Sequence, residues 1–361
     1  MCGICGIVDF AGSASDHKRR LAPMVQTLEH RGPDDSGIWA EDRAAIGHAR
    51  LSIIDLDTGA QPLCNEDRTV WIAYNGEIYN FRELHKQLES KGHHFRTRSD
   101  TEVIVHLYEQ EGIGCVEKLS GMFAFALWDS KIGKMFLVRD RIGIKPLYYT
   151  ITDGKLIFGS EIKAILASRL VARAVNTEAL SDYLTFLYVP EPKTMFRDIY
   201  KLQPGWWMSF DSTGPFERQY WDLPIPQVTE SSQGQVEEQL IDKLKTSVNE
   251  RLVSDVPLGA FLSGGVDSSA VVAMMSNAGQ KPLVTTSIGF DQDKYNELPY
   301  ARQVAERYNT QHHEHIVTSD AVSIVEKLSW HYDEPFADYS AIPTYYVSAA
   351  ARQHVTVALS G

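Results

Sequence analysis

Long apolar runs are missing from this sequence, and it has no basic start followed by an apolar stretch. A membrane-spanning helix needs roughly 18 or more apolar residues in a row, and a secretory signal needs that basic and apolar start. A disulfide scaffold is excluded as well, because only 4 cysteines occur among 361 residues and their spacing is uneven. We therefore expect a protein of the reducing cytoplasm with no membrane partner.

Positive charge is also scarce in the chain. Lys and Arg number 35 against 47 Asp and Glu, which gives a net charge of -12. Nucleic-acid binding needs a basic surface for the phosphates, so nucleic acid is excluded as a main partner, although a local pocket for a nucleotide is compatible with this charge. Hydrophobic residues make up 43% of the chain, enough for large cores, and the length favours two domains.

The start of the chain offers a nucleophile. If Met1 is removed, Cys2 carries a thiol and a free α-amine on one Cα. Their reference pKa values lie near ~8.5 and ~8, so the amine can take the thiol proton directly or through a water. Two alternatives stay open: an ordinary translation start with cysteine in second place, and a redox or zinc pair with Cys5. The pair is disfavoured because Cys64 and Cys115 are isolated in the sequence.

Three motifs that follow have a structural and a functional interpretation. Arg31 lies in a charged turn, where a salt bridge is favoured over substrate contact. Arg50 lies in a predicted strand, 44–54, and needs a carboxylate partner, which by itself favours an internal ion pair over a substrate carboxylate. Asn75-Gly76 between apolar runs favours a hairpin turn, but an Asn amide beside a Gly N–H also suits an oxyanion hole.

The next segments complete the pattern of the first half. Ser99–Glu102 has the spacing of a capping box, which makes Asp100 a structural carboxylate at a helix start. Strands are predicted for 121–128, 134–139 and 155–160. This pattern indicates an α+β domain with packed antiparallel sheets.

A second domain is predicted after a polar, proline-punctuated stretch, 224–234, which suits a linker. There, a strand at 256–262, a Ser/Gly loop at 263–269 and a helix at 270–275 predict a phosphate cradle, because the loop N–H groups and the helix dipole favour an anion. It is not a Walker A loop, since no Gly-Lys-Ser/Thr follows. Asp267 would oppose a phosphate unless a divalent cation lay between them, and the structural alternative is a small-residue turn with Asp267 as a helix cap.

Alternating strands and helices continue from there and predict a parallel sheet. The expected elements are 283–290, 297–309, 313–318, 341–352 and 355–359. A metal site at His312, His313 and His315 is disfavoured, because the neighbouring Glu314 points away from the strand face that His313 and His315 share. The sequence stops at Ser360-Gly361, where ligand-contacting loops begin in a parallel sheet, so we expect a further segment in the whole protein.

Six motifs in this order resemble the glutamine-dependent asparagine synthetases over the whole chain: Met1–Ile4, His30–Asp34, Arg50–Ile54, Tyr74–Tyr79, Ser99–Glu102 and Ser263–Ser269. The resemblance implies an α+β N-terminal-nucleophile hydrolase sandwich (αββα) followed by an α/β Rossmann-like ATP-pyrophosphatase domain. The implied boundaries are 1–212 for a type-2 glutamine amidotransferase domain, 213–234 for a linker and 235–361 for the N-terminal part of the synthetase domain.

The resemblance also implies roles for single residues. In the amidotransferase domain these are Cys2 as nucleophile, Asn75 and Gly76 as the oxyanion hole, Arg50 on the glutamine α-carboxylate, Glu77 and Asp100 near its α-ammonium, and contacts to glutamine from Ile53 and Asn75. In the second domain the implied ATP-binding residues are Leu262, Ser263, Gly264, Gly265, Asp267, Ser268, Ser269, Ile288, Ser360 and Gly361, with Asp267 as a Mg²⁺ ligand.

The implied reaction is ATP-dependent synthesis of asparagine from aspartate. Cys2 would release ammonia from glutamine, and the products would be AMP, pyrophosphate, glutamate and asparagine. Two alternatives stay open: a related amidotransferase that amidates another carboxylate, for example in envelope or polysaccharide biosynthesis, and a non-synthetic glutamine sensor. An intact Cys2 and an intact 263–269 loop argue against the sensor. The oligomeric state is left open, with a homodimer as one option.

Overall fold

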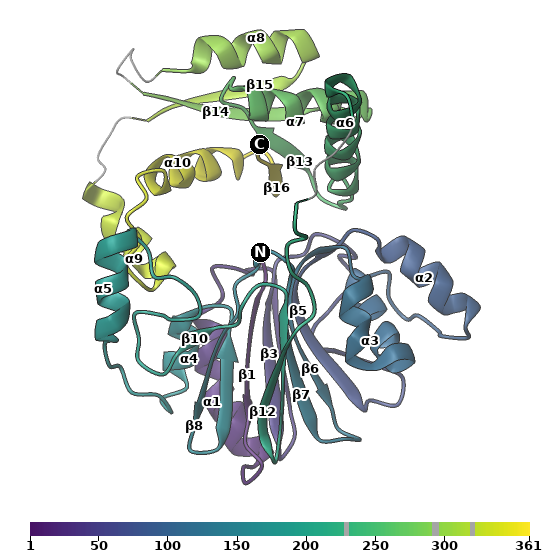
Figure 1. Cartoon of the computed structure of the whole chain (residues 1–361), viewed down its shortest axis with the longest axis vertical. Helices are drawn as coiled ribbons and strands as arrows, with labels where there is room; N and C mark the ends of the chain where they lie inside the picture. The colour runs from purple at the N-terminus through teal and green to yellow at the C-terminus, as the bar shows by residue number, and fades with distance from the viewer. Residues whose placement is uncertain (227–230, 291–295, 318–321) are drawn as a thin grey trace. The chain divides into compact units, whose positions relative to one another are not determined.

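The computed structural model describes residues 1–226, 231–290, 296–317 and 322–361. It divides into two compact units (Figure 1). The first comprises Met1–Pro224 together with Tyr332–Ala337, and the second comprises Ile225–His331 together with Asp338–Gly361.

The first unit is built on two six-stranded sheets in which every described strand pair is antiparallel. One sheet has the order β10-β8-β9-β1-β3-β2, with β1 Gly3–Val8, β2 Asp35–Ala40, β3 Ala44–Arg50, β8 Tyr148–Thr152, β9 Lys155–Gly159 and β10 Tyr200–Lys201. The other has the order β12-β11-β7-β6-β5-β4, with β4 Leu63–Cys64, β5 Val70–Ile78, β6 Gly121–Asp129, β7 Lys134–Arg139, β11 Trp206–Asp211 and β12 Gly214–Gln219.

Side-chain alternation along the strands separates two cores. On β1, Ile4 and Val8 join the cluster between the two sheets, where they meet Ala73 of β5 and Trp128 of β6. Cys5 and its alternate neighbours point to the other face of β1 and pack under the helices. Because successive strand residues face opposite sides, each strand of the central pairs buries both of its faces.

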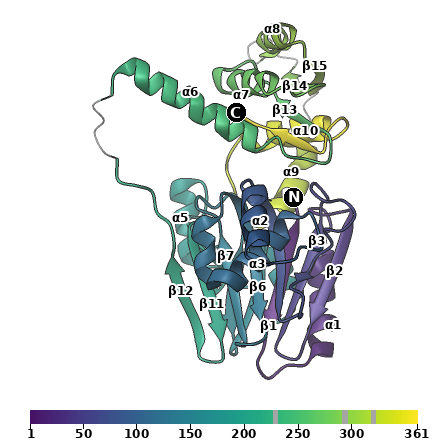
Figure 2. The ribbon, with the colours of Figure 1, turned by 90° about the vertical axis from the view of Figure 1, so that its right-hand side faces the viewer.

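Helices cover the outer faces of both sheets. The helices α1, Ala14–Gln26, and α4, Ile162–Ala167, bury their apolar side chains on the first sheet, and Figure 2 shows α1 beside β2 and β3. The second sheet is covered by α3, Asp100–Glu111, with α2, Phe81–Ser90, packed on α3. The remaining helices of this unit are α5, Thr177–Phe186, and the 3-10 helix Gly112–Lys118. The predicted αββα sandwich is confirmed.

The second unit contains a parallel sheet with the order β15-β14-β13-β16. Its elements are α6 Gln233–Glu250, β13 Leu258–Phe261, α7 Val266–Asn277, β14 Val284–Phe290, α8 Leu298–Tyr308, β15 Gln311–Val317, a 3-10 turn Val322–Ile324, α9 Val325–Tyr332, α10 Ala341–Ala351 and β16 Val357–Leu359. Figure 1 shows α8 and α10 on opposite faces of the sheet. Parallel strands with helices on both faces confirm the predicted Rossmann-like α/β architecture.

Several local predictions can be compared with these elements. Residues 213–234, predicted as a linker, include β12, which pairs with β11 and continues the second sheet; residues 227–230 of that stretch lie outside the described residues. None of the described helices combines the length and the apolar character that a membrane crossing requires.

Candidate active site

Cys2 lies directly before β1, at one end of the first sheet. The β1–β3 register pairs Gly3 with Ala49, so Cys2 lies beside Arg50, the last residue of β3. Cys2 is two residues before Ile4, whose side chain faces the second sheet, so strand alternation directs the thiol to that same face. The antiparallel pairing therefore brings together two residues that are 48 positions apart.

Backbone groups of Leu51 hold the thiol. The amide of Leu51 donates to Cys2 Sγ at 3.4 Å, and Cys2 Sγ donates to the carbonyl of Leu51 at 3.6 Å. Burial raises the pKa of the Cys2 thiol, and the Leu51 contact, the chain N-terminus and Arg50 offset only part of that rise. The thiol is therefore protonated at neutral pH and needs a base to become a nucleophile.

Arg50 is buried, with only 7% of its surface exposed. Its guanidinium donates to three backbone carbonyls, those of Ile54 at 3.4 Å, Asp55 at 2.5 Å and Leu56 at 3.4 Å. No carboxylate forms an ion pair with it among the residues that the structure describes, so the internal ion pair favoured from sequence alone is wrong. A guanidinium has five N–H donors, so Arg50 keeps donors for an incoming carboxylate. The same contacts hold the loop that contains Ile53.

Asn75 and Gly76 lie inside β5, which runs without a break from Val70 to Ile78 beside β6. The hairpin interpretation of this dipeptide is therefore wrong. Asn75 is buried, and its Nδ2 has no hydrogen-bond partner among the described residues. A side chain at Gly76 would lie 2.3 Å from the carbonyl oxygen of Met122, which explains the glycine. Asn75 shares the strand face of Ala73, which points to the first sheet, so this unpaired donor is available on the face where Cys2 lies.

The two carboxylates implied for the glutamine α-ammonium lie on neighbouring elements. Glu77 follows Asn75 on the same face of β5. Asp100 is the first residue of α3, and its Oδ2 accepts from Tyr74 Oη at 2.8 Å and from the amide of Ile78 at 2.9 Å. Burial raises the pKa of Asp100 in spite of these hydrogen bonds. Asp100 is thus fixed to the end of β5 that carries Asn75 and Glu77.

The predicted capping box at the start of α3 is only half formed. Ser99 Oγ accepts from the amide of Thr101 at 3.2 Å and caps the helix. Glu102, however, accepts from the amides of Arg96 at 2.9 Å and Thr97 at 2.7 Å instead of reaching back to Ser99. The carboxylate of Glu102 therefore holds the loop before α3 and does not cap the helix as the motif predicts.

Two charged side chains near Cys2 were not singled out by the sequence. Lys145 is buried, and burial lowers its pKa, although Glu77 and Cys2 lie close enough to oppose that shift. Glu161 lies beside Arg31, whose Nε donates to the carbonyl oxygen of Cys2 at 2.9 Å. The signals available in the sequence were a lysine in the turn before β8 and a glutamate directly before α4. Neither residue lies in a sequence pattern that connects it with Cys2.

Arg31 and Glu161 form part of a buried ion-pair chain. Arg31 Nη1 and His30 Nε2 contact Glu161 Oε1 at 2.9 Å and 3.0 Å, and Lys163 contacts Glu161 Oε2. Burial would raise the pKa of Glu161, but the hydrogen bond with His30 and the charges of Arg31 and Lys163 outweigh it and lower the pKa to about 2. The salt-bridge interpretation of Arg31 is confirmed, and this salt bridge also holds the backbone of Cys2.

The ion-pair chain extends to a distant part of the sequence. Lys163 Nζ contacts Asp333 Oδ1 at 3.0 Å, and the amide of Lys163 donates to Asp333 Oδ2 at 3.0 Å. The next residue, Glu334, contacts Lys201 Nζ at 2.6 Å and accepts from the amide of Met195 at 3.0 Å. These acidic residues explain why Tyr332–Ala337 belongs to the first unit.

Glu161→Gln should lower the free energy of unfolding of the first unit by about 3–5 kcal/mol, the usual cost of removing one partner from a buried ion pair. The neutral amide would leave Arg31 without its compensating charge and Lys163 with Asp333 as its remaining partner. Urea unfolding followed by tryptophan fluorescence measures the change. Asp16→Asn is the matched control, because it removes an exposed ion pair with Arg19 and Arg20 and should leave the unfolding free energy nearly unchanged. Equal effects from both variants would contradict the expectation.

The predicted phosphate loop lies at the carboxyl end of β13. Gly264 has φ +84°, and a side chain there would lie 2.5 Å from the amide nitrogen of Ala301. Ser263 Oγ and Ser268 Oγ lie 3.0 Å apart across the loop, and α7 begins after Gly265 with no side-chain cap. The N–H groups of the first turn of α7 are therefore available to an anion.

The other residues implied for ATP approach this loop from neighbouring strands. Ser360 and Gly361 follow β16, and a side chain at Gly361 would lie 2.5 Å from the amide nitrogen of Ser268. Ile288 lies on β14, two residues beyond the Thr286 that pairs with β13, and Leu262 is buried at the end of β13. The strand order changes direction at β13 and β16, which is where α/β sheets bind ligands.

Among the described residues, the histidines of β15 do not come together as a group of metal-capable donor atoms. His312 Nδ1 lies 2.9 Å from Thr285 Oγ1, while the ring of His313 stacks on that of His354 with centroids 3.5 Å apart. In the part of the chain that the structure describes, the metal-capable groups lie elsewhere, at His93, His106 and Glu109.

Two family models match successive parts of the chain. Residues 1–221 match the family model of the glutamine amidotransferase domain, and residues 239–361 match that of asparagine synthase. Asparagine synthetase [glutamine-hydrolyzing] 1 of Bacillus subtilis is 36% identical over 364 residues, which cover 100% of this chain and 57% of the relative. The chain belongs to the glutamine-hydrolysing asparagine synthetase family. A second relative, named "Putative asparagine synthetase [glutamine-hydrolyzing] 2" in Methanocaldococcus jannaschii, is 39% identical. The match covers 100% of this chain and 74% of the relative.

The relatives in this asparagine synthetase family are longer than this chain. Asparagine synthetase [glutamine-hydrolyzing] 3 of Arabidopsis thaliana is 33% identical, over 92% of this chain and 54% of the relative. The chain thus spans little more than half the length of the B. subtilis and A. thaliana relatives. Among solved structures, the B. subtilis glutamine phosphoribosylpyrophosphate amidotransferase complexed with ADP and GMP has 14% identity and a TM-score of 0.47, over 94% of this chain and 92% of that one.

Proposed function

We propose that the first unit hydrolyses glutamine with Cys2 as the nucleophile. The observation that carries this proposal is the buried Nδ2 of Asn75, which has no hydrogen-bond partner within the described ranges and lies on the strand face shared with Cys2. A buried donor without a partner costs free energy unless a ligand satisfies it, and the oxyanion of a tetrahedral intermediate is such a ligand. Arg50 supplies a buried cation with spare donors on the adjacent strand.

The proposed reaction uses the terminal amine that removal of Met1 would expose. This amine takes the thiol proton, and Cys2 Sγ attacks the amide carbon of glutamine while Asn75 and Gly76 donate to the developing oxyanion. The C–N bond then breaks, the amine returns the proton to the leaving nitrogen, and ammonia departs. Water hydrolyses the remaining γ-glutamyl thioester to glutamate and regenerates the thiol.

Glutamine hydrolysis by the purified chain tests this proposal. Glutamate and ammonia should form in equal amounts from glutamine, and asparagine should be a poor substrate because its shorter side chain separates the amide from the α-carboxylate held by Arg50. Absence of glutaminase activity in a folded chain whose intact mass shows that Met1 is removed would overturn the proposal.

Arg50→Lys should weaken glutamine binding by about 1.5–3 kcal/mol, the range for a hydrogen bond to a charged group. A lysine ammonium cannot donate two parallel hydrogen bonds to a carboxylate, and it would also lose the carbonyl contacts at Ile54 to Leu56. Steady-state kinetics should show a higher KM for glutamine. An unchanged KM would mean that Arg50 only supports the loop that follows it.

For the whole protein we propose synthesis of asparagine, with glutamine, aspartate and ATP as substrates. The second unit would place the ATP pyrophosphate on the 263–269 loop, and aspartate would be activated by adenylation before ammonia displaces AMP. The exposed Asp267 in the first turn of α7 fits a Mg²⁺ ligand, because its charge would otherwise repel the phosphates that the adjacent helix N-terminus attracts. Bound Mg²⁺ would offset the charge of the pyrophosphate.

Asp267→Asn should remove the Mg²⁺ dependence of ATP binding. In the unsubstituted chain, replacing Mg²⁺ with EDTA should weaken ATP binding by at least about tenfold, or 1.4 kcal/mol, whereas the variant should bind equally weakly in both conditions. Isothermal titration calorimetry measures both affinities. Asp242→Asn on α6 is the control for loss of a negative charge, and its Mg²⁺ dependence should be that of the unsubstituted chain. Glutaminase activity should be unchanged in both variants.

The acceptor acid is tested separately from glutamine and ATP. The proposed site residues would bind glutamine and a pyrophosphate, and the relatives extend beyond the region that they share with this chain. Release of AMP and pyrophosphate by the whole protein, compared between aspartate and other carboxylic acids, separates asparagine synthesis from amidation of another acceptor. Release that does not depend on aspartate would favour the other acceptor.

A further inference from the structure

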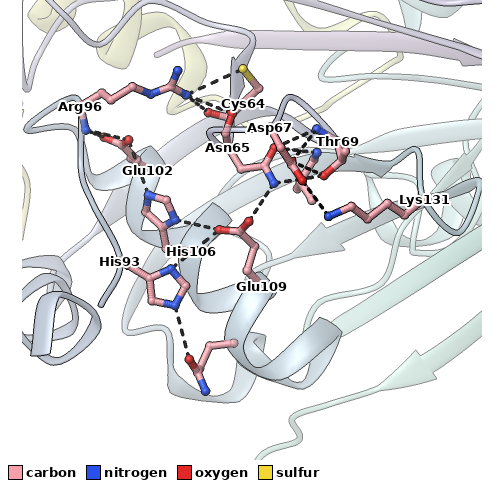
Figure 3. Close-up of polar contacts among 12 residues, drawn as sticks. Cys64, Asn65, Asp67, Thr69, His93, Arg96, Glu102, His106, Glu109 and Lys131 are labelled. Carbon is pink, nitrogen blue, oxygen red and sulfur yellow. Dashed lines mark hydrogen bonds and ion pairs between the residues drawn. The ribbon is translucent and has the colours of Figure 1, made fainter. Parts of the chain in front are cut away.

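Two histidines and a glutamate converge beside the outer helix of the second sheet. His106 and Glu109 lie three residues apart on α3, so they share one helix face. His93 comes from the loop that joins α2 to α3, and its ring centroid lies 5.0 Å from that of His106. Figure 3 shows the three side chains pointing toward one another.

The distances between their donor atoms are close to those of a metal site. Glu109 Oε2 lies 2.8 Å from His106 Nδ1 and 3.9 Å from His93 Nδ1, and one donor atom from each of the three residues lies within 4.8 Å of the others. In a tetrahedral zinc site with bonds of about 2.0–2.2 Å, donor atoms lie roughly 3.3–3.5 Å apart. The two separations from Glu109 fall on both sides of this value and the third is at most 4.8 Å, so side-chain shifts of roughly an ångström would form the site.

Each of the three residues has a further polar partner on the side-chain atom that does not face the cluster. Glu102 Oε1 lies 3.6 Å from His106 Nε2, and Gln110 Oε1 lies 3.4 Å from His93 Nε2. Asn65 Nδ2 donates to Glu109 Oε1 at 2.7 Å. Such outer partners fix the ring orientation of metal-binding histidines and the direction of ligating carboxylates. The carboxylate beside His106 Nε2 is the arrangement found behind many zinc-bound histidines.

The cluster lies between the protein interior and solvent. His106 is 1% exposed, and its Nδ1, on the side of the ring away from Glu102, faces Glu109. Glu109 and His93 keep 25% and 17% of their side chains exposed, which gives an ion access from solvent and leaves room for a water as fourth ligand. Two imidazoles and one carboxylate suit zinc and similar divalent transition metals better than Mg²⁺ or Ca²⁺, which prefer oxygen ligands.

We propose that His93, His106 and Glu109 bind one Zn²⁺ ion and thereby fasten the α2–α3 loop to α3. This loop continues through Arg96 and Thr97 to Asp100. The backbone amides of Arg96 and Thr97 already donate to Glu102 of α3. A metal here would therefore stabilise the segment that positions a candidate glutamine-binding carboxylate. When no metal is bound, a protonated His106 Nδ1 donates a hydrogen bond to the same Glu109 oxygen, Oε2, at 2.8 Å.

Zinc binding to the whole chain tests the proposal. After metal is removed with EDTA, the unsubstituted chain should bind one Zn²⁺ more per chain than the His93→Ala variant. Titration against a chromophoric chelator and elemental analysis after gel filtration measure the zinc content. His94→Ala is the matched control, since His94 is the adjacent, exposed histidine and takes no part in the cluster. It should retain the full zinc content.

Two further readouts separate this site from weaker binding at Cys2 or at other histidines. Co²⁺ in place of Zn²⁺ should give the visible absorption of a tetrahedral site, and His93→Ala should lose it while His94→Ala keeps it. Zinc should also slow amide hydrogen exchange in residues 93–99 of the unsubstituted chain and of His94→Ala, but not of His93→Ala. His93 lies on a surface loop, so its variant should fold. Equal zinc content and equal affinity in the His93→Ala and His94→Ala variants would overturn the proposal.

Discussion

Cys2→Ala should lower the kcat for glutamine hydrolysis by at least about 10⁴-fold, in line with the loss of a covalent nucleophile in other hydrolases. The substitution removes the sulfur that would form the thioester, together with its two contacts to the backbone of Leu51. Because a thiol is a weak donor and a weak acceptor, the free energy of unfolding should change little. Ammonia release measured under saturating glutamine, together with urea unfolding, tests both parts.

Cys5→Ala is the control for this experiment. Cys5 is fully buried on the opposite face of β1, where burial raises the pKa of its thiol and keeps it protonated. Its replacement should leave kcat within a few-fold of the original value and cost only packing energy. An equal loss of activity in the two variants would support a paired role for the two cysteines and contradict a single nucleophile at Cys2.

Local elements were predictable from the sequence because they depend on short-range periodicity. Apolar residues at helical spacing within 16–29 belong to α1, Ala14–Gln26, with Leu21, Met24 and Val25 on its buried face. The strands expected at 121–128 and 134–139 are β6 and β7. These predictions hold because the same apolar pattern that marks an element also buries it.

The hairpin prediction at Asn75-Gly76 failed for a physical reason. A local turn signal was overridden by the pairing of β5 with β6 along its whole length, which no nearby residue encodes. The same applies to Glu161, which contacts Arg31 from 130 positions away, and to Asp333, which is 170 positions from Lys163. Their charges are visible in the sequence, but their partners depend on strand order.

Asn75→Ala should lower kcat by about 10²–10³-fold, the usual loss when one oxyanion-hole donor is removed. The reason lies in the unpaired Nδ2: it makes no hydrogen bond to the described protein, so its proposed partner is the oxyanion that forms only during the reaction. The KM for glutamine should change little, because the ground-state amide oxygen binds this donor less strongly. Steady-state kinetics with glutamine measures both constants.

Asn80→Ala provides the opposite result and completes this test. Asn80 lies five residues further on, and its side chain is fully used: Nδ2 donates to the carbonyl of Lys118 at 2.9 Å, and Oδ1 accepts from the amide of Ser120 at 3.0 Å. Its loss should lower the free energy of unfolding by about 1 kcal/mol and leave kcat unchanged. Asn75→Ala should instead lower kcat and leave the free energy of unfolding nearly unchanged, since Asn75 Nδ2 has no hydrogen-bond partner in the part of the chain that the structure describes. If Asn75→Ala mainly destabilised the protein and kept its kcat, Asn75 would be a structural residue, and the oxyanion would need another donor.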